Sequence, residues 1–422
     1  MSVTCESILN MPELRNNIRL LAGECGLDSA IRWTHILEST ESIQFLQGNE
    51  LTFLTGIKLG KDTGKLLSII ERLTQKHAAG LVINTGKFIP SIPQKAIEKA
   101  NALSFPLFEI PWNVRLVDVT KLIGTAIVES SMEESSMSYL LEKILLSNQD
   151  NFQDYLYSAE FYGYNFTGPM RIAIVDLPHI TDSARPSEHT RLINYRQKIR
   201  YLIGSVLRST LHTKLLSMWK NNYFIFILPV NPANDLEQAD CIAKLIIKKM
   251  TSSLPTLSFF MGLGGYYDQI KQLKISYNEA QLSLKLVEDH TGKKYILYAN
   301  TGIYQFLNKL QDRSVMAEFY RKTLGKLLLY DQENGTDFTE TLHVYLEEGE
   351  NSANTVQKLF IHRNTLQYRL HRIEEILCQN LKNSDVKISL QIAFKIQKFL
   401  TYEGLLTEDE LEGSQDKAPQ IG

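Results

Sequence analysis

The sequence predicts a multidomain protein with an α/β domain first, an α+β domain in the middle and an all-α domain towards the C-terminal end. Three observations predict this order. Apolar runs alternate with helical periodicity over residues 1–125, a hairpin pattern breaks the alternation in the middle of the chain, and only helical periodicity remains after residue 303. The length of 422 residues agrees, because it corresponds to about three domains.

The first 125 residues show the strand and helix alternation of a mostly parallel sheet. Apolar runs at 51–55, 80–86 and 105–110 have the length and composition of buried strands. The segments 66–77 and 94–103 between them carry apolar residues at helical spacing. Strands joined by helices of this length form βαβ units, so we expect a parallel sheet.

A long helix is predicted at 116–147, and its second part, 126–147, is the expected connector to the next domain. Apolar residues fall near one face of its first half, and the polar stretch 129–138 interrupts them. Two interpretations stay open: a plain connector, or a dimer-forming helix with a short apolar seam.

Residues 148–300 predict an α+β domain with an antiparallel component. The expected elements are a strand at 171–176, a helix at 191–211, a hairpin within 218–229, a helix at 236–250, a strand at 257–263 and a helix at 269–287. Lys220-Asn221-Asn222 supplies the hairpin turn.

The domain at 301–405 is predicted to be helical and to carry a helix-turn-helix at 351–378. A helix at 338–347 ends before Gly349, Asn351 or Ser352 caps a second helix that runs to 359, and a third helix covers 363–377. The polar stretch 406–422 has no periodicity, and we expect it to be disordered.

The third of these helices separates an apolar stripe from a polar face. Its stripe residues recur at spacings of four, three and four: Leu366, Leu370, Ile373 and Leu377. The polar face carries side chains that donate to phosphates or read base edges, since Arg pairs with guanine and Asn or Gln with adenine. Arg363, Asn364 and Gln367 lie in the N-terminal half, which meets bases in helix-turn-helix proteins. The predicted DNA-binding residues are Lys358, Arg363, Asn364, Thr365, Gln367, Tyr368, Arg369, His371 and Arg372.

Local charge favours the same segment as a nucleic-acid surface. Residues 355–382 contain five Lys or Arg residues and two Glu residues, which give a net charge of +3, whereas the whole chain carries −2. On spacing and charge alone, a solvated face of an ordinary helical bundle explains the pattern equally well.

The run 359–370, LFIHRNTLQYRL, closely resembles the C-terminal helix-turn-helix of the PucR/CdaR family of bacterial regulators, as does the Arg372-Ile373 pair that follows it. Segments of 1–125 (22–24, 31–33, 46–56 and 108–112) resemble that family's sensory domain, and 148–300 is similar to its degenerate GGDEF-like domain. The resemblance implies metabolite-responsive control of catabolic operons. Effectors in the family come from purine breakdown, sugar diacids and amino acids.

Enzymatic activity of the middle domain is not expected. A nucleotide cyclase needs acidic residues on a strand and on the following hairpin to hold divalent metal. Asp176 ends a predicted strand, but the hairpin turn at 220–222 contains no carboxylate. The glycine-rich run 261–266 lacks the full dinucleotide-binding pattern, so we interpret it as a strand-to-helix turn. We expect no metal and no cofactor, and His362 is expected to order the turn before the third helix.

Composition excludes several classes of protein. The four cysteines are scattered, which fits a reducing cytoplasm, and no apolar run reaches the length of a membrane span. The first residues lack the basic and apolar regions of a signal peptide. We therefore expect a cytoplasmic protein that does not bind membranes.

The expected partners are double-stranded promoter DNA, a small-molecule effector and further copies of the chain, because one helix-turn-helix contacts only a short half-site. Ligands of open α/β sheets bind beyond the carboxyl ends of the strands. That rule gives the candidate effector residues Glu38, Thr55, Gly56, Asn84, Thr85, Gly86 and Glu109, each of which also suits a turn. The sequence favours a transcription activator; an enzyme with cyclase-like activity and a protein-binding scaffold are the alternatives.

Overall fold

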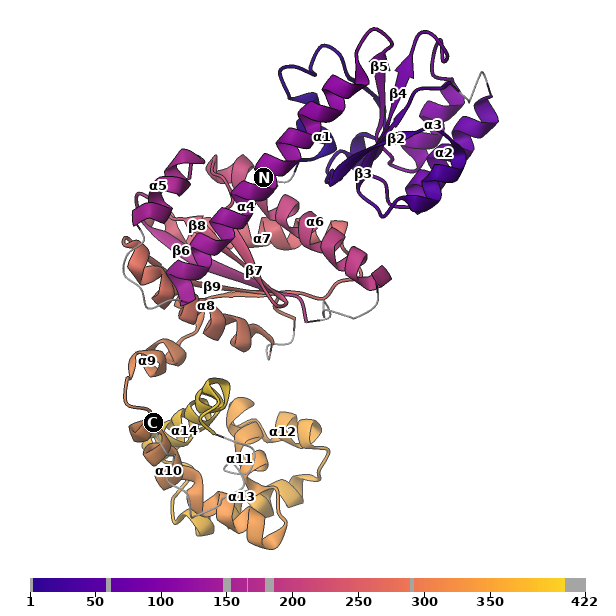
Figure 1. Ribbon diagram of the computed structural model, residues 1–422. Coiled ribbons are helices and arrows are strands. Elements are labelled where there is room, and N and C mark those ends of the chain that lie inside the picture. Colours follow the sequence, from indigo (N-terminus) through magenta and orange to yellow (C-terminus); the bar gives the residue numbers. More distant parts are fainter. Residues whose placement is uncertain are drawn as a thin grey trace. The chain divides into compact units, whose positions relative to one another are not determined.

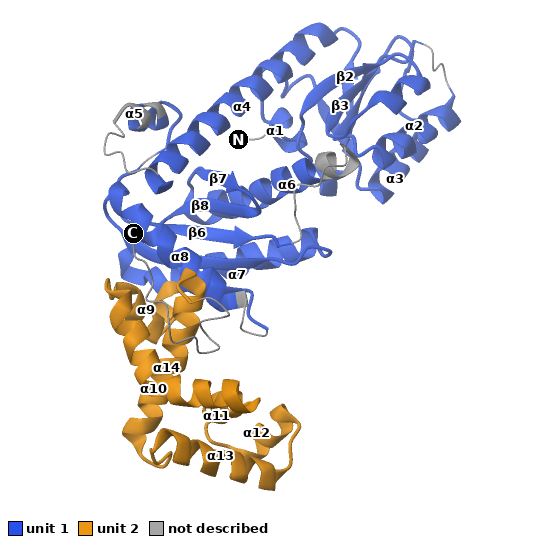
Figure 2. Ribbon diagram, turned by 60° about the horizontal axis from the view of Figure 1, so that its bottom comes forward, with its two compact units in different colours: residues 1–297 blue, residues 298–422 orange. Residues whose placement is uncertain are grey.

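The computed structural model describes residues 3–57, 62–146, 153–164, 166–178, 186–288 and 292–406. It divides into two compact units, residues 1–297 and residues 298–422 (Figure 2). The first unit contains two sheets with their helices, and the second is helical (Figure 1). The predicted fold class, α/β then α+β then all-α, is confirmed.

The N-terminal sheet has the order β1-β5-β4-β3-β2. Strands β2 to β5 run parallel, as expected, and β1 adds an antiparallel edge next to β5. The bounds are β1 Arg19–Ala22, β2 Trp33–Leu37, β3 Glu50–Leu54, β4 Gly80–Thr85 and β5 Leu107–Pro111.

Helices cover both faces of this sheet. Apolar residues of α2 (Thr63–Gln75) and α3 (Gln94–Ala102) pack with Leu81 and Ile83 of β4 on one face. On the other face, Val82 packs with α1 (Cys5–Leu9) and the start of α4. Neighbouring residues of a strand point to opposite faces, so a sheet buried on both sides requires the continuous apolar runs seen in the sequence.

The long helix α4 (Leu116–Leu146, 31 residues) links the two sheets of the first unit (Figure 1). Its first turns bury Val119 and Ile123 in the N-terminal core, and its last turns bury Leu140, Leu141 and Ile144 near β7 and α8. The helix continues without a break through the polar stretch at 129–138.

The second sheet has the order β10-β9-β6-β8-β7, with antiparallel pairs except for β10 and β9. Helices α6 and α7 share a core with one face, and α8 packs on β9 and β6. The bounds are α5 Gln153–Phe161, β6 Met170–Asp176, α6 Pro186–Leu211, β7 Ser217–Lys220, β8 Tyr223–Pro229, α7 Asp235–Ser253, β9 Phe260–Tyr267, α8 Leu273–Glu288 and β10 Tyr295–Leu297.

One expectation for this sheet is wrong. The glycine-rich run 261–266 is not a strand-to-helix turn but lies inside β9. A Cβ at Gly262 would stand 2.2 Å from the carbonyl oxygen of Ala280, and one at Gly264 would stand 2.1 Å from that of Ser276. These glycines therefore let α8 approach the sheet closely.

The C-terminal unit consists of helices (Figure 2), with α10 packed against α11, α13 and α14. The bounds are α9 Ile303–Lys309, α10 Arg313–Asn334, α11 Phe338–Glu347, α12 Ser352–Leu359, α13 Arg363–Leu377 and α14 Ser384–Glu403. The expected disordered tail lies outside the described residues from 407 onward. In the described ranges, every helix is too short or too polar to span a bilayer.

Candidate nucleic-acid interface

Helix α12 begins at an N-cap formed by a side chain. Gly349 and Glu350 adopt positive φ angles of 61° and 66°, which turn the chain sharply after α11. The side-chain oxygen of Asn351 then accepts hydrogen bonds from the backbone N–H groups of Ala353 (3.0 Å) and Asn354 (3.3 Å). Of the two predicted capping residues, Asn351 is the cap.

The turn between α12 and α13 orders the start of α13. Phe360 ends α12 in the left-handed conformation, with φ 53°. His362 caps α13, where its Nδ1 accepts a hydrogen bond of 3.3 Å from the backbone N–H of Asn364. The expectation that His362 orders this turn is confirmed.

The predicted apolar stripe anchors α13 to the domain. Leu366, Ile373 and Leu377 are buried, and Leu370 is half-buried. With one face fixed inward, the residues on the opposite side of a helix must point to solvent.

The outward face of α13 carries most of the predicted DNA-binding side chains. Arg363, Gln367 and His371 follow each other at intervals of four, and Asn364 and Tyr368 lie beside them; all five are exposed. Within the described ranges, the side chains of Arg363, Asn364 and Gln367 make no hydrogen bond or ion pair in the chain. This face therefore offers one cation and two amides that are free to bind a ligand.

Arg369 and Arg372 point towards the helices behind α13. Nη1 of Arg369 donates a hydrogen bond of 2.8 Å to Oγ1 of Thr341 on α11. Arg372 pairs with Glu375, and its Nη2 donates to the hydroxyl of Tyr330 on α10 over 3.2 Å. The hydrogen bond to Tyr330, followed by Glu375, raises the pKa of Arg372 above its usual value.

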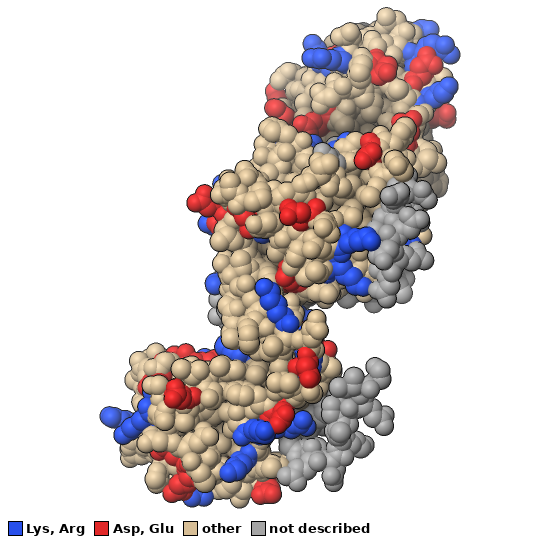
Figure 3. All heavy atoms as spheres, turned by 90° about the vertical axis from the view of Figure 1, so that its left-hand side faces the viewer, with Lys and Arg blue, Asp and Glu red and all other residues tan. Residues whose placement is uncertain are grey.

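The remaining candidates lie at the edges of this surface. Thr365 is exposed on the flank of α13. Lys358 on α12 lies 3.4 Å from Glu347 and 3.1 Å from Glu348, and Nε2 of His371 lies 3.3 Å from Oε1 of Glu375. Figure 3 shows both signs of charge interspersed on the drawn face of the C-terminal unit. The excess of positive charge in the α12–α13 segment therefore does not extend over the whole C-terminal unit.

The sequence analysis did not single out Phe360, which lies in the turn between α12 and α13. Its side chain is 93% exposed, although it occupies a backbone conformation that favours glycine. The signal available in the sequence was a bulky residue directly between a helix end and the next cap.

The middle domain contains the carboxylate considered above for a cyclase, Asp176, which is hydrogen-bonded to the hairpin turn that joins β7 and β8. Asp176 ends β6, is buried, and accepts a hydrogen bond from the side-chain amide of Asn222. Asn221 and Asn222 form the predicted hairpin turn between β7 and β8, which brings no carboxylate to Asp176.

The predicted effector residues lie at or after the ends of β2, β3 and β4, except Glu109, which lies within β5. Oγ1 of Thr85 donates to Oε1 of Glu109 (2.9 Å), and Oε2 of Glu109 lies 2.9 Å from Nη2 of Arg19. Asn84 and Gly56 are buried, whereas Glu38 is exposed. Their assignment to an effector stays a prediction, as do the individual DNA contacts.

Models of three domain families match the chain in sequence order. Residues 7–127 match the purine catabolism regulatory protein-like family, residues 147–286 match a GGDEF-like domain, and residues 338–396 match the PucR C-terminal helix-turn-helix domain. The last match covers α11, α12 and α13.

Parts of the chain are similar in sequence to named proteins. The chain is 29% identical to the DNA-binding transcriptional activator AdeR of Bacillus subtilis over 256 residues. This alignment covers 57% of this chain and 59% of AdeR. Identity to the proline-responsive transcriptional activator PutR of the same organism is 27% over 183 residues, 42% of this chain and 44% of PutR. Identity to the carbohydrate diacid regulator of Escherichia coli is 29% over 146 residues, 34% of this chain and 36% of that protein.

Proposed function

Because this chain belongs to the PucR family of transcription regulators, we propose that it controls transcription by binding operator DNA with α13. The chain matches 59% of AdeR and 44% of PutR, so it spans only part of these two activators. Their names support the proposal for the part that they share with this chain.

One observation carries the assignment: the face of α13 opposite its buried stripe bears Arg363, Asn364 and Gln367, whose side chains have no hydrogen-bond or ion-pair partner among the described residues. A guanidinium group pairs with guanine, and a side-chain amide pairs with adenine, in the major groove. All three residues belong to the first half of α13, the part of a recognition helix that meets base edges.

We assign Arg369 and Arg372 mainly to positioning α13. Their guanidinium groups already donate to Thr341 and Tyr330, on the helices behind α13. A phosphate contact by either residue would have to come from the remaining N–H donors of its guanidinium group. Arg363 and, after release from its Glu partners, Lys358 are the better placed cations for DNA.

The regulator would act as a cytoplasmic dimer or higher oligomer that responds to a metabolite and activates a catabolic operon. A single helix-turn-helix contacts only a short half-site, which favours a paired arrangement. AdeR and PutR are named as activators, and PutR as proline-responsive, which supports activation and sensing. The hydrogen bond between Asp176 and Asn222 supports a middle domain without catalysis.

The test measures binding of the full chain to labelled DNA from upstream of its own and neighbouring genes, by fluorescence anisotropy at several salt concentrations. We expect preference over scrambled DNA and a negative log–log salt slope of about 0.9 per phosphate contacted. Arg363→Gln should weaken binding, whereas the matched control Arg321→Gln, an exposed change on α10, should not. Equal binding to both DNAs, or affinity independent of salt, would refute the function.

A further inference from the structure

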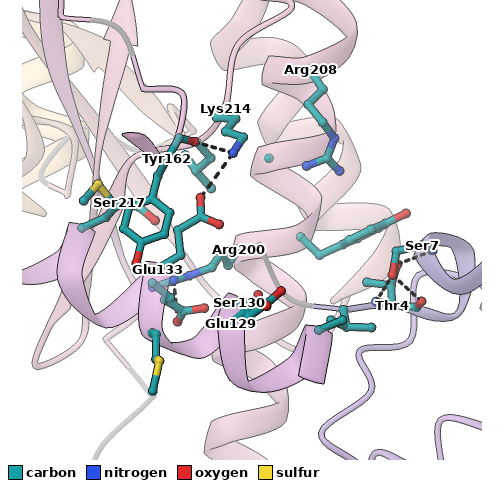
Figure 4. A pocket seen from close by; sticks show the side chains of 18 of the residues that line it. Thr4, Ser7, Glu129, Ser130, Glu133, Tyr162, Arg200, Arg208, Lys214 and Ser217 are labelled. Carbon is teal, nitrogen blue, oxygen red and sulfur yellow. Dashed lines mark hydrogen bonds and ion pairs between the residues drawn. The ribbon is translucent and has the colours of Figure 1, made fainter. Parts of the chain in front are cut away.

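The inner side of helix α4 is turned to the two domains of the first unit. Val119 and Ile123, from the apolar face considered above as a dimer seam, pack in the N-terminal core. Further along the helix, Oε1 of Glu133 lies 3.5 Å from Nζ of Lys214 in the middle domain (Figure 4). That apolar face is therefore not available to another chain.

The outer side of α4 carries a second row of residues, which we call the outer row. Its positions alternate at intervals of four and three, the spacing at which two packed helices keep a continuous line of contact. At 1.5 Å per residue the row extends over about 38 Å. All of its members are exposed: Lys121, Thr125, Val128, Met132, Ser135, Tyr139, Glu142 and Leu146.

Apolar side chains make up half of the outer row and continue beyond its start. Val128, Met132, Tyr139 and Leu146 are exposed, Met132 by 62%, and so is Val117, one turn before the row. Single exposed apolar residues are common on protein surfaces. A line of them along one side of a long helix, opposite the side that is buried in its own domains, marks a surface for contact with another protein.

The charges of the outer row identify that protein as a second copy of the chain. Within the described ranges, the side chains of Lys121 and Glu142 make no hydrogen bond or ion pair. The two residues are equally far in sequence from the point between Ser131 and Met132. If a two-fold axis passes through that point, a second α4 runs antiparallel to the first, and Lys121 faces Glu142 of the partner subunit at both ends.

A parallel pair would have the opposite effect. Each residue would then face its own copy, which brings Lys121 against a second lysine and Glu142 against a second glutamate. Like charges placed directly opposite each other disfavour an interface. The charge pattern therefore selects the antiparallel arrangement.

We propose that α4 is the dimer interface of this protein and packs antiparallel on α4 of a second copy through the outer row. Val128 then lies opposite Ser135, Val117 opposite Leu146, and the two Met132 side chains meet at the axis. The inference rests on the proposed function, in which two copies bring two recognition helices to DNA, and it names the surface that joins the copies.

The test measures the dimer dissociation constant of the full chain by sedimentation velocity over a range of concentrations. Lys121→Glu and Glu142→Lys should each raise this constant about tenfold or more, because the two-fold axis turns two attractive contacts into two repulsive ones. The combined change Lys121→Glu with Glu142→Lys should restore it to the wild-type value. The matched control Lys95→Glu, an exposed change on α3, should leave it unchanged.

Met132→Glu supplies a second, independent variant. It places two carboxylates beside the axis at the centre of the apolar contact, so the protein should sediment as a monomer. Circular dichroism melts of each variant show whether it is folded, and recovery of the dimer in the combined charge change excludes unfolding as the cause.

Three results would overturn the proposal: a wild type that is monomeric at every concentration, single charge changes that leave the dissociation constant unchanged, or a combined change that does not restore the dimer. An interface elsewhere on the chain, or a parallel pair, would give the second result. Binding to operator and scrambled DNA is measured on the same samples. Intact DNA preference with any of these three results refutes only the interface, whereas lost DNA preference in a wild-type dimer refutes the proposed function.

Discussion

Replacing Arg369 by Met is expected to loosen the recognition helix from the domain behind it. The change removes the hydrogen bond from Nη1 of Arg369 to Oγ1 of Thr341, 2.8 Å long, and keeps the alkyl chain. Thr341 is fully buried, and its own hydroxyl donates to the carbonyl oxygen of Asp337 over 2.7 Å. The acceptor side of that hydroxyl would be left unpaired.

The expected loss of stability is about 1–2 kcal/mol, the lower part of the range for a hydrogen bond to a charged group, because Arg369 is only half-buried. Hydrogen exchange of the α11 and α13 amides in the full chain measures it, because local opening reports the free energy of this segment. The matched change Arg363→Met, on the exposed face, should cost less than about 0.5 kcal/mol.

A double-mutant cycle with Thr341→Val separates this contact from others. We expect an interaction energy of about 0.5–2 kcal/mol between the two changes, as for residues in direct contact. If Arg369→Met protects these amides as well as Arg363→Met does, or the cycle gives no coupling, Arg369 does not position α13.

Three further changes test other parts of the structure. Phe360 has a left-handed backbone and a side chain that is 93% exposed, so Phe360→Gly should raise the free energy of unfolding by up to about 1 kcal/mol. The same change should weaken DNA binding if Phe360 belongs to the interface. Cys378→Gly, at the left-handed end of α13, should give only the gain in stability, measured by denaturant titration. Gly264→Ala places a Cβ 2.1 Å from the carbonyl oxygen of Ser276, so it should destabilise the middle domain by about 3 kcal/mol in thermal melts. The control Gly124→Ala, in open space on α4, should stabilise the protein by about 0.5–1 kcal/mol. Burial lowers the pKa of His343, so the folded C-terminal unit favours the neutral ring; its stability should be complete above the unfolded pKa of about 6.5 and fall as pH drops below it. His343→Asn melts followed by circular dichroism should lose that pH dependence, and an unchanged dependence would assign it to other groups.

Elements with strong periodicity or buried on both faces were predictable from the sequence. The fully buried strand β4 reads as a continuous apolar run, and α13 reads as a stripe at helical spacing. The cap of α12 was predicted to be Asn351 or Ser352, and the structure has Asn351. His362 was expected to order the turn before α13, but its role as the cap of α13 was not predicted.

Edge elements escaped prediction because their residues carry no clear pattern. Strand β2 lies at the edge of its sheet, where Trp33 is 58% exposed and only Leu37 is buried. Strands β1 and β10 have four and three residues, too few for periodicity to appear. The glycines of β9 required knowledge of α8 lying against them, which depends on tertiary packing.

Helical spacing predicted which side of α13 is buried and which is exposed, but not which side chains bond to the neighbouring helices. Helical spacing separates the buried Leu366 from the exposed Gln367. It does not show that Arg369 donates to Thr341 or that Arg372 donates to Tyr330. These bonds join residues about 28 and 42 positions apart, so no local pattern in the sequence encodes them.

The most direct test of the recognition surface compares the wild type with Gln367→Ala on an operator and its single-base variants at fixed salt. If Gln367 reads a base, the Ala variant should lose about 1–3 kcal/mol on the preferred site and discriminate less at one position, with other positions unaffected. Gln391→Ala, an exposed amide change on α14, should behave like the wild type. Unchanged affinity and unchanged base preference for Gln367→Ala would contradict the assignment of this face of α13 to DNA.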